Sequence, residues 1–219
     1  SLLGGFGFNT QPLACLDQLE LPLHAIDINT LLTAPFTLDD LCDAIIHTLA
    51  PKKNNTLIAY STGGLLAINI ALRRPDLIKQ LILINSTPKF LEESDWQGIK
   101  AKEFKRLAAK LTTLSRLNFM RHFTQLAAFP NKINPQDYSD SWSDSSKENL
   151  TALMTIILTT DLRDALKSLT VNRHFVNAEL DILVLKNKLN APQTYLTDST
   201  HLQFDQSELL SVMKSALCC

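Results

Sequence analysis

The sequence has no long hydrophobic run. Its longest apolar stretches, such as residues 81–84, are far shorter than the roughly 20 residues that a membrane-spanning helix needs. It also lacks a basic excess, because 21 lysines and arginines against 22 aspartates and glutamates give a net charge of −1. A nucleic-acid binder usually carries such an excess. Internal repeats and low-complexity tracts are absent too, so we expect a globular protein with neither a membrane nor a nucleic-acid partner.

Cysteine is scarce, and the four cysteines form no C-x-x-C pair, so a zinc ribbon or a thioredoxin-type site is not indicated. Cys15 and Cys42 lie among leucines and isoleucines and are predicted to be core residues. Cys218 and Cys219 end the sequence, where we expect frayed thiols. The N-terminus lacks the basic region that precedes the apolar part of a signal peptide, so the cytoplasm is the expected compartment.

The 219 residues, of which 45% are hydrophobic, predict one domain with room for a small inserted subdomain. Short apolar runs alternate with helix-length amphipathic stretches in the first 85 residues and again after the middle of the chain. This alternation favours a parallel sheet with crossover helices. Strands are expected at 2–3, 21–28, 56–60, 79–85, 173–178 and 194–197, and helices at 37–49, 63–74 and 206–217.

The middle of the chain has a different character. Residues 87–158 show helical patterns without a convincing strand, and Pro130, Pro135 and a Ser/Asp-rich run at 139–146 divide them. We interpret this segment as an all-helical insertion. The predicted organisation is a core of residues 1–87 and 159–219 and a helical lid of residues 88–158.

The sharpest local signal is the run A-Y-S-T-G-G at residues 59–64, between an expected strand and an expected helix. This is the context of a nucleophile elbow, usually written G-x-S-x-G, in which small residues flank a tight turn. Ala59 stands at the first glycine position and is still small. The elbow predicts Ser61 as a nucleophile. The alternative is an ordinary serine that caps the following helix.

A nucleophilic serine needs a base, and in hydrolases with this elbow the chain order is serine, acid, histidine. Three histidines follow Ser61. His122 lies in the helical insertion and His174 lies inside an expected strand. His201 comes just after an expected strand, in a loop that could reach over the sheet, and is therefore the predicted base.

The predicted acid is Asp181, which follows the expected strand at 173–178. A carboxylate at the carboxyl end of a parallel strand points toward the same crevice as the elbow. The alternatives are Asp161 and Asp164 in a helical stretch, Asp198 close to the predicted base, and Asn190 in a second reading of the strands.

A glycine-rich loop at residues 4–9 follows the opening Leu2-Leu3 pair. Such a loop can bring one backbone N–H to an oxyanion hole, and the N–H of Thr62 would supply a second. A G-G-x-G loop alone is weak support, because tight turns use glycine anyway. Beside the elbow it gains weight.

Together, the loop G-F-G-F-N at 5–9, the elbow, and R-P-D-L-I at 74–78 resemble the α/β-hydrolase fold family. D-W-Q-G-I-K at 95–100 and T-D-L-R at 160–163 are similar, more specifically, to the pimeloyl-acyl carrier protein methyl ester esterases of biotin synthesis. The resemblance implies a mostly parallel sheet flanked by helices, with a helical lid. It also places residues 2–3 in the third strand of the fold, so the preceding strands are expected to be absent.

The resemblance implies a monomeric serine carboxylesterase that releases methanol and free pimeloyl-acyl carrier protein and needs no metal or organic cofactor. Gly4 stands where the family has histidine, and the segment between acid and histidine is shorter than usual. The implied site residues are Ser61, Asp181 and His201 for catalysis, Phe6 and Thr62 for the oxyanion hole, and Phe6, Tyr60 and Phe123 for the acyl channel.

An acyl carrier protein is the implied partner. Residues 98–122 carry seven basic side chains against one acid, a net charge of +6, which would attract an acidic carrier. Asn118 replaces a basic residue of the family, and a solvated helix face is the plain alternative. The expected carrier contacts are Lys105, Arg106, Arg121 and His122.

Two further interpretations stay open. One is a broad carboxylesterase for short acyl esters, and the other is a hydrolase-like protein that only binds a partner. Gly4, Ala59 and the missing strands favour the second of these. The order of serine, acid and histidine argues for an enzyme, since a degraded site would have lost one of them.

Overall fold

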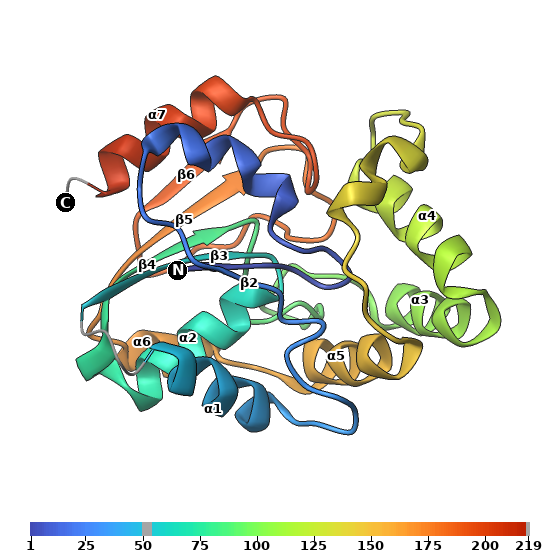
Figure 1. The fold of residues 1–219 in the computed structure, drawn as a ribbon, viewed down its shortest axis with the longest axis horizontal. Coiled ribbons are helices and arrows are strands. Elements are labelled where there is room, and N and C mark those ends of the chain that lie inside the picture. Colours follow the sequence, from blue (N-terminus) through green and yellow to red (C-terminus); the bar gives the residue numbers. More distant parts are fainter. Residues whose placement is uncertain (50–53, 218–219) are drawn as a thin grey trace.

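Six parallel strands form one sheet in the order β2-β1-β3-β4-β5-β6 (Figure 1). The computed structural model describes residues 1–49 and 54–217, and Cys218 and Cys219 lie outside these ranges. The central strands β3 and β4 are almost wholly buried, as strands covered on both faces must be. The strands are β1 (Leu2–Leu3), β2 (Ala25–Ile26), β3 (Asn55–Tyr60), β4 (Ile78–Ile84), β5 (Asn172–Ala178) and β6 (Gln193–Leu196).

Helices cover both faces of the sheet. Helices α1 (Leu38–Leu49), α2 (Gly63–Arg73) and α6 (Arg163–Ser168) lie on one face. Helix α7 (Gln206–Leu217) packs beside the 3-10 segment η1 (Gln11–Leu19) on the other face (Figure 1). These two layers enclose the apolar core, in which Cys15 and Cys42 are buried as predicted.

The start of α1 shows why the sequence signal was reliable there. Thr37 precedes the helix, and its hydroxyl oxygen accepts from the backbone N–H of Asp40 at 3.2 Å. The Asp40 carboxylate in turn accepts from the N–H of Thr37 at 2.8 Å. This reciprocal pair satisfies donors that a helix start leaves unpaired.

Between β4 and β5 the chain forms α3 (Ala101–Thr113), α4 (Arg116–Ala127), η3 (Pro135–Ser141) and α5 (Lys147–Thr159). These elements lie together beyond the carboxyl ends of the strands, on the right of Figure 1. No described helix combines the length and the apolarity needed to cross a bilayer.

One expectation on the first part of the chain was wrong, and one element was not expected at all. The strand expected at 21–28 shrinks to β2, because Pro22 has no N–H for the ladder and Leu23 turns back to donate to the carbonyl of Leu21 at 2.7 Å. The segment η1 was not foreseen, since a short 3-10 helix has no strong periodic pattern.

The segments 95–100 and 160–163, which carried the more specific resemblance, meet in an ion-pair cluster. Arg163 donates to Asp161 at 2.8 Å, to Glu93 at 2.6 Å and to Asp95 at 3.1 Å. Lys89 lies between the same acids, 2.9 Å from Asp161 and in contact with Glu93. The cluster therefore ties the chain leaving β4 to the chain that returns ahead of β5.

This cluster makes a prediction about pH. Hydrogen bonds from Arg163, and then from Lys89, hold the pKa of Asp161 well below its usual value. A carboxyl group whose pKa is lower in the folded than in the unfolded protein stabilises the fold at pH values above its unfolded pKa of about 4. This stabilisation is lost as the pH falls through the folded pKa. Because Asp161 is partly exposed, we expect Asp161→Asn to lower the free energy of unfolding at pH 7 by only about 1 kcal/mol.

Urea unfolding at pH 7 and pH 3 measures this effect, and the difference between Asp161→Asn and wild type should shrink at pH 3. Asp164→Asn is the control. Asp164 and its partner Lys167 are both exposed to solvent, so this substitution should change the free energy of unfolding little at either pH. Equal losses for Asp161→Asn at both pH values would contradict the assignment.

Candidate active site

Ser61 sits on a strained turn between the end of β3 and the start of α2. Its φ is +53°, in the left-handed region that side chains rarely adopt. Ser61 donates its N–H to the carbonyl of Ile84 at 2.9 Å and accepts at its own carbonyl from the Ser86 hydroxyl at 2.8 Å. A Cβ on Gly64 would lie 1.8 Å from that hydroxyl oxygen, so only glycine fits there. The turn is thus held on both sides and presents the serine side chain at the carboxyl end of the sheet.

His201 and Ser61 are brought together by the loop after β6. The His201 Nε2 atom lies 2.9 Å from the Ser61 Oγ atom. On the other side of the ring, Nδ1 lies 2.7 Å from Asp181 Oδ2. A proton on Nδ1 that is donated to Asp181 leaves Nε2 free to accept from the serine hydroxyl, which is the arrangement that activates a serine. The two side chains are almost completely buried, at 1% and 0% exposure.

The orientation of Asp181 is fixed by its second oxygen. Oδ1 accepts the backbone N–H groups of Leu183 at 2.7 Å and Val184 at 3.0 Å. These bonds orient the carboxylate so that Oδ2 faces His201. They also supply hydrogen bonds that a buried carboxylate needs in place of water.

The other candidate acids and histidines lie in different pairings. Asp161 belongs to the ion-pair cluster, and Asp164 pairs with Lys167. Among the histidines, His174 bonds to a threonine hydroxyl on β6, and His122 lies beside Lys110 on another helix.

Two side chains that the sequence analysis did not assign to this task hold the histidine loop. Asn85, directly after β4, donates to the carbonyls of Thr200 at 3.1 Å and His201 at 3.0 Å, and accepts from the N–H of Ala178 at 2.7 Å. The Tyr60 hydroxyl donates to the same His201 carbonyl at 2.8 Å. The available signal was a polar residue ending an apolar strand, but its partners are more than 90 residues away.

Tyr60, which the resemblance placed in an acyl channel, is fully buried. Burial, and then the charge of Asp181, hold the pKa of its hydroxyl well above the usual value, so that the hydroxyl remains a donor. Its role in substrate binding stays a prediction. Its contact in the structure is with the loop of His201.

The glycine loop packs directly on the elbow. A Cβ on Gly5 would lie 3.0 Å from the Ser61 Cβ, and one on Gly63 would lie 2.4 Å from the Gly4 carbonyl oxygen. Neither Phe6 nor Thr62 donates its backbone N–H to an acceptor in the described part of the chain. The glycine loop and the elbow thus each contribute one free backbone donor where the two turns meet at Ser61, and an oxyanion hole requires such donors.

Gly4 has a steric reason to differ from the family's histidine. A Cβ there would lie 2.8 Å from the carbonyl oxygen of Phe8. The loop folds back on itself at this point, and a side chain would push it open.

The side chain of Phe6 leads from the loop to the helical segment. Its ring meets that of Phe123 on α4 edge to face, with centroids 5.1 Å apart. Phe119 packs against both rings, each at 6.1 Å. The structure thus brings two of the three residues expected in the acyl channel together in one aromatic cluster.

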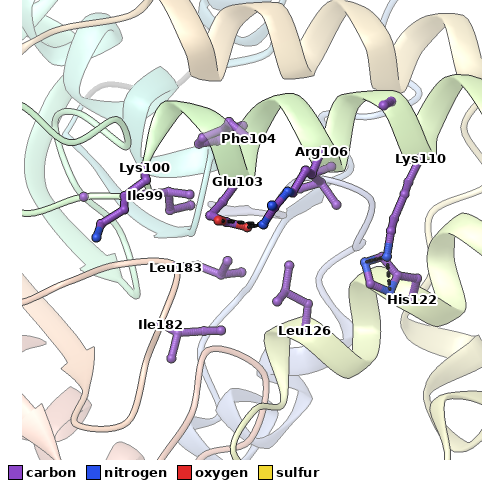
Figure 2. Close-up of a pocket in the computed structure, with 13 residues that line it drawn as sticks. Ile99, Lys100, Glu103, Phe104, Arg106, Lys110, His122, Leu126, Ile182 and Leu183 are labelled. Atoms are coloured by element: carbon purple, nitrogen blue, oxygen red, sulfur yellow. Dashed lines mark hydrogen bonds and ion pairs between the residues drawn. The ribbon is translucent and has the colours of Figure 1, made fainter.

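A pocket of about 680 Å³ lies between α3, α4 and the segment that follows Asp181 (Figure 2). Ser61 is not part of its wall. The apolar side chains of its wall are Ile99, Phe104, Leu107, Ala109, Leu126, Ile182 and Leu183, and its charged or titratable side chains are Lys100, Glu103, Arg106, Lys110 and His122.

Two of the four expected carrier contacts, Arg106 and His122, thus lie at this pocket. Arg106 donates to Glu103 at 3.0 Å, and the Lys110 Nζ atom lies 3.0 Å from His122 Nε2 (Figure 2). Burial, and then Lys110, lower the pKa of His122. The other two contacts are exposed outside the pocket wall: Lys105 on α3 and Arg121 on α4.

Within the described ranges, no group of three or more His, Cys, Asp or Glu side chains is placed to hold a metal ion.

Residues 3–153 match the model of the alpha/beta hydrolase fold. The chain therefore belongs to the alpha/beta hydrolase fold family, and the predicted fold is confirmed. A bromoperoxidase from Bacillus anthracis shares the fold with a TM-score of 0.83 at 14% identity, covering 100% of this chain and 91% of that one. An esterase from Exiguobacterium antarcticum superposes with a TM-score of 0.80 at 15% identity, with the same coverage.

Within the family, the chain is similar to proteins named pimeloyl-[acyl-carrier protein] methyl ester esterase. The relative from Vibrio parahaemolyticus is 31% identical over 196 residues, which are 84% of this chain and 76% of the relative. The relative from Pseudoalteromonas atlantica is 29% identical over 203 residues, with the same two coverages. These relatives agree with the predicted enzyme class, a carboxylic ester hydrolase.

The strained turn makes a prediction about stability. Ser61→Gly and Ser61→Ala both remove the hydroxyl, but only glycine relieves the left-handed backbone. We expect Ser61→Gly to be more stable than Ser61→Ala by about 1 kcal/mol in urea unfolding.

The control is the same pair at Ser211, an exposed position inside α7, where alanine should be the more stable residue. An alanine variant at Ser61 as stable as the glycine variant would show that the turn is not strained.

Proposed function

We propose that the protein is a serine carboxylesterase that hydrolyses the methyl ester of pimeloyl-acyl carrier protein to methanol and the free pimeloyl-acyl carrier protein of biotin synthesis. The observation that carries the proposal is the hydrogen-bonded series Ser61, His201, Asp181 at 2.9 Å and 2.7 Å, beside two free backbone donors. The similarity to the named esterases supports this choice of substrate.

In the proposed reaction the Ser61 Oγ atom attacks the ester carbonyl carbon while His201 Nε2 takes its proton. The N–H groups of Phe6 and Thr62 bind the oxyanion of the tetrahedral intermediate. His201 then returns the proton to the methoxide as the C–O bond breaks, so methanol leaves. A water molecule gives a proton to His201 and attacks the acyl-serine. His201 returns that proton to the Ser61 Oγ atom as the acyl C–O bond breaks, the free acid leaves as its carboxylate, and Asp181 keeps the imidazole in the required tautomer.

The carrier-bound substrate suits the surroundings of the site. The carrier-bound substrate combines an apolar acyl chain with a phosphopantetheine arm that carries a phosphate, and the pocket between α3 and α4 combines apolar side chains with more basic than acidic ones. We assign residues 88–158 as the lid that shapes this route, and Lys105, Arg106, Arg121 and His122 as contacts of the acidic carrier. We propose further that the protein acts as a monomer in the cytoplasm and uses no metal ion or organic cofactor.

The first test concerns the triad. Ser61→Ala and His201→Ala should each lower kcat/KM for an ester by at least about 1,000-fold, because triad members act as a unit. Asp181→Asn should lose most activity as well, whereas Asp198→Asn should keep it. The measurement is demethylation of methyl-pimeloyl carrier protein, followed by mass, beside hydrolysis of a short-chain aryl ester.

The two substrates separate the candidate functions. Serine-dependent demethylation with the carrier substrate preferred supports the proposal. Turnover of the aryl ester alone would leave a generalist carboxylesterase, and turnover of neither would leave a binding protein. Activity that survives Ser61→Ala would refute the site.

The second test concerns the basic face. Replacing Lys105, Arg106 and Arg121 together by glutamate should raise KM for the carrier-linked substrate by about 10-fold or more and leave the aryl ester unaffected. Added salt should weaken the carrier substrate of wild type in the same selective way. Equal effects on both substrates would contradict a carrier contact and would leave Lys105, Arg106 and Arg121 as solvated surface residues.

A further inference from the structure

The loop that carries the proposed oxyanion donor is held by one buried asparagine. Asn29 lies three residues beyond β2 and is 0% exposed. Its Oδ1 atom accepts from the N–H of Gly7 at 2.7 Å. Its Nδ2 atom donates to the carbonyls of Gly5 at 2.9 Å and Phe8 at 3.0 Å. A single side chain thus makes three hydrogen bonds to the backbone of the loop.

These bonds determine where the Phe6 N–H points. The peptide between Gly5 and Phe6 is planar and trans, so its C=O and N–H point in opposite directions. The Gly5 carbonyl accepts from Asn29 at 2.9 Å and from the N–H of Phe8 at 3.2 Å, so the Phe6 N–H is turned away from Asn29. Gly5 lies against the Ser61 side chain, where a Cβ would come within 3.0 Å of the serine Cβ.

We propose that Asn29 is a positioning residue: it sets the orientation of the Phe6 N–H and so tunes how well the site binds the oxyanion. The proposal rests on the esterase function proposed above, and it adds a residue that neither the motif nor the triad contains. Asn29 touches neither the serine nor the histidine, and acts through the loop backbone alone.

Asn29 is itself held from behind. The Oδ1 atom of Asp27 accepts from the Asn29 Nδ2 atom at 2.7 Å and from the backbone N–H of Asn29 at 3.0 Å. Ser143, which follows η3, donates its hydroxyl to the other oxygen of Asp27 and its N–H to the carbonyl of Gly7 at 2.9 Å. Asn149 on α5 donates to the Asn29 carbonyl at 2.9 Å. The loop is therefore coupled to the helical segment as well as to the sheet.

The chemistry explains why an amide stands here. The loop offers one donor and two acceptors to this side chain, and only a carboxamide supplies both an acceptor oxygen and a two-proton donor. The two Nδ2 protons are shared among the two loop carbonyls and Asp27. An aspartate of the same shape would place a charge against two carbonyl oxygens, and an alanine would leave buried polar groups unpaired.

The test uses Asn29→Asp and Asn29→Ala with a short-chain aryl ester. We expect kcat per active site to fall by about 10- to 100-fold while KM stays within about twofold, because the interaction strengthens in the transition state. The affinity for a trifluoromethyl ketone, which forms an oxyanion on the serine, should fall in parallel. Active sites are counted by stoichiometric reaction with a fluorophosphonate, so unfolded protein does not enter kcat.

Gln80→Ala is the matched control, since Gln80 on β4 is also buried and also donates to a backbone carbonyl, that of Ala216 on α7, but makes no bond to the loop at residues 4–9 or to Asn29. It should lower the Tm comparably to Asn29→Ala and keep kcat within about twofold. Asn29 variants with wild-type kcat and ketone affinity, or a control with the same loss of kcat, would overturn the proposal.

The wild-type protein separates this proposal from the function on which it rests. If wild type hydrolyses the aryl ester but not the carrier ester, the substrate is wrong and the test of Asn29 still stands. If wild type neither turns over an ester nor binds the ketone, both proposals fall.

Discussion

The close approach of two backbone turns is the constraint on which the rest of the site depends. One turn is the glycine loop after β1, and the other is the elbow between β3 and α2. A Cβ on Gly63 would lie 2.4 Å from the carbonyl of Gly4, so the turns can meet only without side chains. Five of the six glycines of the sequence, at positions 4, 5, 7, 63 and 64, lie in these turns. Their contact places the free backbone donors beside Ser61 before any substrate arrives, which is the preorganisation that electrostatic catalysis needs.

The parallel sheet supplies the remaining groups from one edge. Ser61, Asp181 and His201 follow β3, β5 and β6, and the carboxyl ends of parallel strands meet at the same side. Position along the edge is then refined by buried asparagines. Asn85 joins the end of β5 to the histidine loop, and Asn29 joins the glycine loop to β2. Each asparagine bonds to backbone groups of a segment that has no regular hydrogen-bonding pattern of its own. The positions of the glycine loop and the histidine loop therefore depend on side chains that do not touch the substrate in the proposed reaction.

The sequence predicted the parts whose signals are local. Strands β3 to β6 and helix α7 lie where apolar and amphipathic runs placed them. The elbow motif indicated the serine, and order along the chain indicated an acid and a histidine that the structure brings within hydrogen-bond distance. The rest depends on distant partners. A buried asparagine such as Asn29 differs in no local way from one on a turn, and its role appears only when the loop at residues 4–9 folds against it. Likewise, the motifs containing Asp95 and Arg163 signalled a resemblance, but their ion pair joins positions 68 residues apart. The strand expected at residues 21–28 is apolar enough, but it is shortened to β2 because Leu23 donates its N–H back to the carbonyl of Leu21 and not to a neighbouring strand.

The central claim is that Ser61 is an activated nucleophile in a preorganised site, and its reaction with a fluorophosphonate tests this most directly. Intact-mass and peptide mass spectrometry would locate and count the adducts at neutral pH. The account predicts one adduct per chain, on the peptide that contains Ser61, formed much more slowly in a His201→Ala variant. An unlabelled protein, an adduct on another residue, or equal labelling rates with and without the histidine would contradict it.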